Sequence, residues 1–522
     1  CTKGHEDSIE IRLGHKEDGY RYDPDYPPAV MLAPRYLRRG IGERVISNGT
    51  IKTPMNEHDV REACKIFIDN DIKTIAVSFI WSVLNPSHEI RAAQIIKEMM
   101  PDAIITIGSE LYPQIREYTR TSTAITNAYL SPILRNYVSA INEYFINLGG
   151  KKNVRYFQSN GGLATGKVMS ERSVYAINSG PASAPQAGLS VCNPFDYKNI
   201  ITVDMGGTSF DITLTKDGNT NLNKNIDFLR YRIGIPMIQV ETLGAGGGSI
   251  GWIDEMGLLQ VGPQSAGADP GPACYSKGGE LPTVTDASFV LGYLNKDTFA
   301  GGLDIDIKKS EKCITDRICK PLKIDLIEAA LGIHEIVNSN MAQTLRLVSV
   351  KQGHDPREFT LMPFGGAGPI HSGKLAEISS IKRILIPPTP GVLSALGLML
   401  APIQHEAMNS YEVKERDVKS GEIKKIFKNL DDICLAKMKE DGVTAKEVKR
   451  EYYAEMRYSG QAHEIEIPIP TSIDRNAVKF AVKLFHKTHL SNFSYNDLNA
   501  QTEFVTLRSV HKKQPNDKSL IK

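Results

Sequence analysis

One segment predicts the architecture of the whole chain: Ile200-Ile-Thr-Val-Asp-Met-Gly-Gly-Thr-Ser-Phe-Asp-Ile-Thr-Leu214. A β-branched run ends at Asp204, two glycines follow, and alternation of apolar and polar residues resumes at Phe210. Turn residues at 216–218 close the segment. This pattern predicts two strands joined by a tight glycine loop.

The predicted loop has the groups of a phosphate site. Its residues are Gly206, Gly207, Thr208 and Ser209. Glycine leaves backbone N–H groups unshielded, the hydroxyls add donors, and Asp204 can hold a cation that neutralises phosphate. An ordinary glycine-rich hairpin, with Asp204 and Asp211 as turn acids, explains the same residues. Other segments of the sequence are needed to choose between a phosphate site and an ordinary hairpin.

Composition limits the classes of function. A chain of 522 residues predicts roughly two to four domains. It has 62 basic and 60 acidic residues and a net charge of +2, so neither a nucleic-acid nor a membrane partner is indicated. The longest uncharged run, 384–404, contains four prolines, which a membrane-spanning helix would not tolerate.

Cysteine usage and the first residues bear on location. The seven cysteines form no C-x-x-C pair, which favours reduced thiols over disulfides or a zinc site. No secretory leader pattern precedes Cys1. We expect a cytoplasmic protein, and the chain starts like the interior of a longer one. Cys274 has no histidine near it in sequence, so we expect a packed thiol rather than a nucleophile.

Helices and strands alternate over residues 56–107, which predicts parallel strands in an α/β fold. Glycine-rich runs occur again at 158–162, 244–249 and 365–368. The last run follows a predicted strand and precedes a helix, a junction at which phosphates or a nucleotide's sugar bind. We expect His371 to be a first-turn residue of that helix rather than a ligand.

Composition shifts near residue 413, where Lys and Glu become dense. The pattern of a charged helix followed by two strands predicts a smaller α+β domain. Residues 512–522 are expected to be a frayed tail or a cut-off connection.

Taken in order, these segments resemble the A subunit of the hydantoinase/5-oxoprolinase family, which also includes acetone and acetophenone carboxylase subunits. The resembling segments are Asn85-Pro-Ser-His-Glu89, Ser159-Asn-Gly-Gly162, Ser179-Gly-Pro181, Val203-Asp-Met-Gly-Gly-Thr-Ser209, Gly244-Ala-Gly-Gly-Gly-Ser249, Ser265-Ala-Gly-Ala-Asp-Pro-Gly-Pro-Ala-Cys-Tyr275, Thr283-Val-Thr-Asp-Ala287, Gly353-His-Asp-Pro-Arg357, Phe364-Gly-Gly-Ala-Gly-Pro369, Pro390-Gly-Val-Leu-Ser-Ala395 and Arg457-Tyr-Ser-Gly-Gln461. They cover nearly the whole chain.

The resemblance implies a fold and a division into domains. The fold is α/β, an actin- and sugar-kinase-like duplicated nucleotide-binding fold with two ribonuclease-H-like halves. Residues 1–115 would be the C-terminal part of the family's N-terminal domain. Residues 116–408 would be the core nucleotide-binding domain, and residues 413–522 part of a C-terminal α+β domain.

The resemblance also implies cofactors and a site. ATP and Mg²⁺ would bind, with Asp204 as the metal ligand and catalytic acid and Asp211 as a weaker second acid. Phosphate would contact Gly206, Gly207, Thr208 and Ser209. The remaining nucleotide contacts would come from Gly246, Gly247, Gly248, Ser249, Gly365, Gly366 and Gly368.

The activity implied is hydrolysis of a cyclic amide of the hydantoin or 5-oxoproline type. ATP would activate the ring carbonyl by phosphorylation, and a hydantoinase B/oxoprolinase B-type subunit would complete the reaction in a hetero-oligomer. Two alternatives stay open, a ketone carboxylase subunit and a non-catalytic scaffold. The sequence does not name the ring substrate.

Three departures qualify the resemblance. Family members carry another Asp-x-Gly-Gly-Thr loop near the N-terminus, and this sequence has none. The C-terminus stops early, and Trp81 stands where the motif usually has His. We therefore expect a fragment, a degenerate subunit, or a chain completed by another polypeptide.

Overall fold

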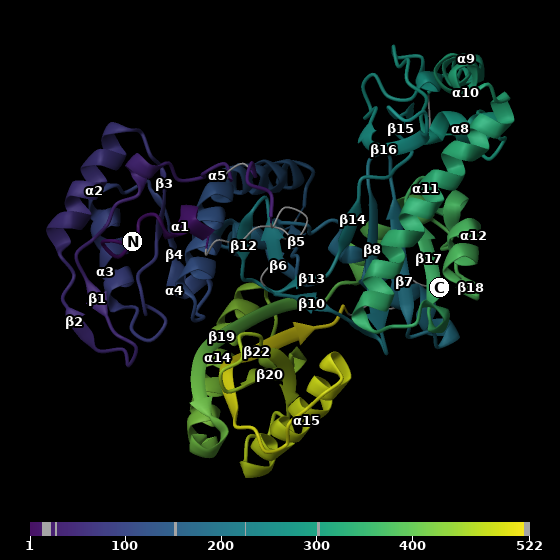
Figure 1. Cartoon of the computed structure of the whole chain (residues 1–522). Coiled ribbons are helices and arrows are strands. Elements are labelled where there is room, and N and C mark those ends of the chain that lie inside the picture. The colour runs from purple at the N-terminus through teal and green to yellow at the C-terminus, as the bar shows by residue number, and fades with distance from the viewer. Residues whose placement is uncertain (13–21, 27–28, 151–153, 225, 300–302, 516–522) are drawn as a thin grey trace. The chain divides into compact units, whose positions relative to one another are not determined.

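The structure, a computed structural model, describes the chain except residues 13–21, 27–28, 151–153, 225, 300–302 and 516–522 (Figure 1). The chain divides into two compact units. The first unit comprises Cys1–Ser179, Asn223–Met237 and Pro402–Pro515. The second comprises Gly180–Leu222 and Ile238–Ala401.

The second unit is built on the sheet that contains the 200–214 segment. Its strands, in spatial order, are β14 (Glu241–Leu243), β8 (Phe210–Lys216), β7 (Ile200–Met205), β17 (Thr360–Phe364) and β18 (Arg383–Ile384), with β9 (Asn219–Thr220) also paired to β8. β7, β8 and β14 are antiparallel neighbours, whereas β17 is parallel to β7 and β18 is parallel to β17. This is the strand order of a ribonuclease-H-like sheet. The predicted hairpin and α/β fold class are confirmed.

Both faces of this sheet are covered by helices, as Figure 1 shows. Side chains alternate along β7: Ile201 and Val203 join the core under α11 (Leu326–Ser349) and α12 (Gly368–Ser379). Ile200 joins the opposite core with α7 (Ala184–Cys192) and α13 (Leu393–Leu400). Because both faces are buried, the strand sequence is almost continuously apolar.

A smaller region of the second unit contains β15 (Ser249–Ile253), β16 (Leu259–Ser265), α8 (Val284–Val290), α9 (Ile307–Ile314) and α10 (Lys320–Leu322). Asp286 anchors it. This fully buried carboxylate accepts hydrogen bonds from the backbone N–H groups of Ala273, Cys274 and Thr283 at 2.9–3.2 Å. It also accepts from the hydroxyls of Thr283 and Ser310 at 2.7 and 2.6 Å. One side chain thus joins three separate segments.

The first unit contains a six-stranded sheet with the spatial order β21 (Ile465–Ile469), β20 (Lys449–Tyr458), β22 (Thr502–Lys513), β19 (Ile403–Lys414), β6 (Leu163–Thr165) and β5 (Arg155–Phe157). Helices α14 (Ser420–Glu440) and α15 (Arg475–Phe493) pack on one face through Phe427 and Phe485. The sheet crosses the predicted boundary at 408–413, and the division into three domains stays a prediction.

The same sheet corrects the predicted C-terminal tail. Lys512 and Lys513 are the last residues of β22 and pair with β19 and β20, so they are not frayed. The predicted tail at 516–522 lies outside the described residues.

The α/β alternation predicted for residues 56–107 is also present in the first unit. Strands β3 (Thr74–Val77) and β4 (Ile104–Ile107) are parallel, and helices α2 (Glu57–Asp69) and α3 (Ser87–Met99) share their core. The long helix α5 (Glu117–Asn147) follows. These are the parallel strands and helices that the sequence predicts.

No helix in the described part of the chain is both long enough and apolar enough to cross a membrane. The uncharged run at 384–404 is divided among the end of β18, α13 and the start of β19.

Replacing Asp286 by alanine would leave five buried donors without their acceptor. We expect Asp286→Ala to lower the free energy of unfolding by about 3 kcal/mol or more. Asp316→Ala is the control, because Asp316 forms an exposed pair with Lys320 on one helix surface and its loss should change the free energy of unfolding little. Urea unfolding followed by circular dichroism measures both. Equal losses in the two variants would contradict the anchoring role.

Candidate functional site

Two of the predicted glycine loops meet at one edge of the second unit's sheet. Because β7 and β17 are parallel, their carboxyl ends lie at the same edge, with Phe364 paired to Asp204. The backbone N–H of Ala367 donates to the Met205 carbonyl at 2.9 Å. Gly365 has φ +80°, and a Cβ there would lie 2.3 Å from Asp204 Oδ1. Only glycine fits this junction without displacing the carboxylate.

The third loop docks onto the first through its backbone. Gly247 N–H donates to the Gly206 carbonyl at 3.0 Å, and Gly248 N–H donates to the Gly207 carbonyl at 2.7 Å. A Cβ on Gly246 would lie 2.6 Å from the Gly207 oxygen. The Ser249 hydroxyl accepts from Gly246 N–H at 2.8 Å and closes the loop on itself. The structure therefore brings three of the four predicted glycine segments together.

Part of this surface is open. A Cβ at Gly206, Gly207 or Gly366 would meet no atom within 4 Å, whereas Gly368 is buried where α12 begins. Thr208 is exposed. The loops therefore pack against one another on one side and present unshielded backbone on the other, which is the arrangement that an anion needs.

The two predicted acids are cross-strand neighbours on β7 and β8. Asp211 accepts hydrogen bonds from the hydroxyls of Thr242 at 2.5 Å and Ser209 at 3.1 Å. Burial, and to a smaller extent the negative charge of Asp211, raises the pKa of Asp204 to about 6. Both causes disfavour the ionised form of Asp204, so the surroundings do not offset its negative charge.

The donor set fits a magnesium ion that is shared with phosphate. Among the described residues, no group of three or more His, Cys, Asp or Glu side chains could hold a metal on its own. Mg²⁺ is commonly held by one or two carboxylates, with phosphate oxygens and water completing its octahedron. Asp204, with Asp211 beside it, provides such a set, and a cation there would offset the uncompensated charge.

Two histidines that sequence reasoning did not assign to the site lie beneath it. His371 is a first-turn residue of α12, as predicted, and its ring stacks on His334 of α11 with centroids 4.8 Å apart. Burial lowers the pKa of His334 to about 4, and burial together with His334 lowers that of His371 to about 3. Both imidazoles are therefore neutral near pH 7. The α11 periodicity marks His334 as inward-facing, but nothing in the sequence pairs it with His371.

Cys274 is a packed thiol, as predicted. It is fully buried, and burial beside Asp286 raises its pKa well above the ordinary range. All seven cysteines are free, and six of them are buried.

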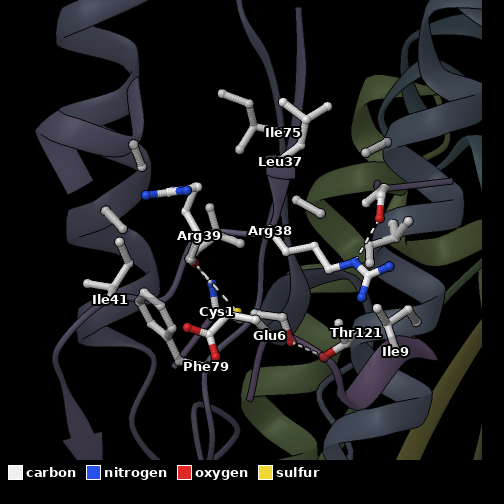
Figure 2. Close-up of a pocket in the computed structure, with 18 of the residues that line it drawn as sticks. Cys1, Glu6, Ile9, Leu37, Arg38, Arg39, Ile41, Ile75, Phe79 and Thr121 are labelled. Carbon is white, nitrogen blue, oxygen red and sulfur yellow. Dashed lines mark hydrogen bonds between the residues drawn. The ribbon is translucent and has the colours of Figure 1, made fainter. Parts of the chain in front are cut away.

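The first unit has a separate cavity of about 250 Å³ (Figure 2). Its lining is mostly apolar and includes Leu37, Ile41, Ile75 and Phe79, with Arg38 at its side. No predicted site residue lines it. The 158–162 loop also belongs to the first unit, where Gln158 and Asn160 contact Gln404 and Glu406 of β19.

Strand order and the meeting of the glycine loops at the carboxyl edge define the class of protein, a ribonuclease-H-like α/β protein. The chain belongs to the hydantoinase/oxoprolinase family. Residues 120–407 match the family's "Hydantoinase/oxoprolinase" region, residues 1–100 its "N-terminal region" and residues 410–495 its "C-terminal domain". The predicted family is confirmed.

Two solved structures and one curated relative are similar over nearly the whole chain. Caprolactamase subunit alpha of Pseudomonas jessenii is 49% identical over 512 residues, which are 97% of this chain and 74% of the relative. The crystal structure of the ATP-dependent caprolactamase from the same organism matches with 48% identity and a TM-score of 0.90, covering 99% of this chain and 76% of that one. The nucleotide-free structure of acetone carboxylase matches with 26% identity and a TM-score of 0.77, with the same coverage.

The junction at Gly365 can be tested with its neighbour as control. Gly365→Ala forces a left-handed alanine and places a methyl against Asp204, so we expect a loss of about 2 kcal/mol in the free energy of unfolding. Gly366→Ala places its methyl in open space and should cost less than about 1 kcal/mol. Denaturant unfolding measures the difference. Indistinguishable losses would contradict the close approach described for Gly365.

Proposed function

We propose that the chain is the ATP-binding subunit of an ATP-dependent cyclic amide hydrolase that acts on a lactam ring. The observation that carries the proposal is the meeting of three glycine loops beside the half-buried carboxylate of Asp204. Similarity to an ATP-dependent caprolactamase over 99% of the chain supports it. The proposal includes Mg²⁺ as the companion of ATP.

The chemistry explains why ATP is needed. An unstrained amide resists water near pH 7, and transfer of a phosphoryl group to the ring's carbonyl oxygen turns that oxygen into a leaving group. The chain's own residues bind and orient. Backbone N–H groups over 207–209 and the Thr208 hydroxyl hold phosphate oxygens, and Asp204 holds the cation. The hydroxyls of Ser209 and Thr242 keep Asp211 oriented beside it.

The open edge would take the nucleotide, since its surface carries no side chains that block an anion. Gly206 and Gly207 leave space for the terminal phosphates, and Gly366 leaves space on the β17 side. Gly246–Ser249 support the first loop from behind through backbone hydrogen bonds. Six of the eight predicted glycines thereby receive either a binding or a supporting role.

The relatives bear on partners and location. The caprolactamase relative is named as a subunit, so we propose a hetero-oligomer with a hydantoinase B/oxoprolinase B-type subunit that completes hydrolysis. We also propose a cytoplasmic location, which seven free cysteines support.

A second candidate is a subunit of an ATP-dependent ketone carboxylase, favoured by the TM-score of 0.77 with acetone carboxylase. The complex with its partner subunit should be assayed with ε-caprolactam, 5-oxoproline and a hydantoin, and separately with acetone plus labelled bicarbonate. Release of the ring-opened acid with ATP consumption supports the hydrolase. Incorporation of label from bicarbonate supports the carboxylase instead.

The cation role of Asp204 can be tested by titration calorimetry with Mg-ATP. We expect Asp204→Asn to weaken binding at pH 7.5 by about tenfold or more, because the amide carries no charge for the cation. Asp217→Asn is the matched control, an exposed acid in the turn after β8, and should bind like the wild type. Equal affinity in all three proteins would remove Asp204 from the site.

Affinity should also depend on pH through Asp204. Its pKa of about 6 is raised, so protons compete with the cation below pH 6 and the competition disappears above it. The affinity advantage of wild type over Asp204→Asn should therefore fall about tenfold between pH 7 and pH 5. Taking the ratio cancels the titration of ATP itself. A ratio that stays constant with pH would contradict the raised pKa.

A further inference from the structure

We propose that His371, Asn338 and His334 are positioning residues that hold two loops of the nucleotide site in register from beneath. The inference rests on the proposed function, because it assigns these residues a role in nucleotide affinity. It is based on a series of buried contacts that connects the 244–249 loop to the 365–368 loop through α8, α11 and α12.

The first contact in this series is made by the 244–249 loop. Both the backbone N–H and the hydroxyl of Thr285 donate to the Gly247 carbonyl, each at 2.8 Å. Thr285 lies in the first turn of α8, so the position of that helix sets the position of the loop. A Cβ on Gly247 would lie 2.7 Å from the Thr285 hydroxyl, which leaves the loop no room to shift toward the helix.

Helix α8 is joined to α11 by a second buried contact. The Ser288 hydroxyl donates to the Val284 carbonyl at 2.8 Å, and its oxygen lies 2.9 Å from His334 Nε2. Since the single hydroxyl proton is used within α8, His334 Nε2 is the donor to the serine oxygen. This assigns a neutral imidazole with its proton on Nε2, in agreement with its lowered pKa.

Helix α11 is joined to α12 through an amide whose orientation is fixed. Asn338 Nδ2 donates to the His334 carbonyl at 2.7 Å, so Asn338 Oδ1 faces the His371 Nδ1 atom 3.0 Å away. An amide oxygen only accepts, and therefore His371 Nδ1 carries the proton. The parallel stack of the two rings, 13° apart, adds a second contact between the helices.

His371 transmits this constraint to the 365–368 loop. It lies in the first turn of α12, three residues after Gly368, and α12 starts where Ala367 N–H is bonded to the Met205 carbonyl. The remaining nitrogen, Nε2, is buried and has no hydrogen-bond partner among the described residues. Such polar groups in an apolar core cost stability that an aliphatic side chain would not. A positioning role accounts for their presence.

The test separates the hydrogen bond from ring packing. His371→Phe keeps a ring for the stack and removes the donor, whereas His371→Asn keeps an N–H near the position of Nδ1. Asn338→Leu removes the acceptor at nearly constant volume. Ser349→Ala is the control, since it removes a buried hydroxyl on α11 that bonds the Leu345 carbonyl of its own helix.

Mg-ATP affinity of the full chain should be measured by calorimetry, with thermal unfolding as the check that each variant is folded. We expect His371→Phe and Asn338→Leu each to raise Kd about tenfold, and the double variant to raise it about tenfold rather than about a hundredfold. His371→Asn should recover most of the affinity, and Ser349→Ala should stay within about twofold of wild type.

Several outcomes would overturn the inference. One is that folded His371→Phe and Asn338→Leu bind like the wild type, and another is that their effects multiply in the double variant. If either fails to fold, Ser288→Ala tests the same connection at α8, and wild-type affinity there counts against it. Failure of the wild-type chain to bind Mg-ATP would instead overturn the proposed function, and the inference with it.

Discussion

The parallel pairing of β7 with β17 is the constraint on which the second unit depends. It places Asp204 opposite Phe364 and therefore sets the ends of two strands, 160 residues apart in the chain, at one edge. The conformation at Gly365 and the start of α12 both depend on this arrangement. Gly365 must lack a side chain because Asp204 is there, and α12 must start where it does because Ala367 is bonded to Met205. The core on both faces of the sheet holds the pairing in register.

Local patterns predicted most of this unit. The pattern around Asp204 predicted both strands of the hairpin, and the spacing of Ile333, Val337 and Met341 is that of a helix with one buried face, as in α11. Each depends only on neighbouring residues and on one buried face. Convergence of the three glycine loops is different, because it joins Gly206 to Gly247 and Gly365 through long-range contacts. Glycine content alone left an ordinary hairpin equally possible, and only the resemblance of ordered segments to a family favoured a shared site.

What escaped prediction consists of contacts between distant residues with ordinary local surroundings. The helical pattern places His334 and Asn338 on the buried face of α11, where the structure also has them. Their contact partner, His371, lies on another helix, α12. The first unit's sheet was not predicted for the same reason. Its strands β5 and β6 pair with each other, and β6 also pairs with β19, some 240 residues later in the sequence. Register between elements far apart in sequence leaves no local periodic signal.

The order of strands in the first unit bears on how the chain folds during its synthesis. β22 lies between β19 and β20, so the last strand among the described residues occupies the middle of the sheet. Until residues 502–513 leave the ribosome, β19 and β20 have no common neighbour and each exposes an unpaired edge. The second unit needs nothing beyond Ala401 among the described residues and can form its sheet earlier. Synthesis therefore passes through a stage with one finished unit and one open sheet, at which chaperone binding would be most useful.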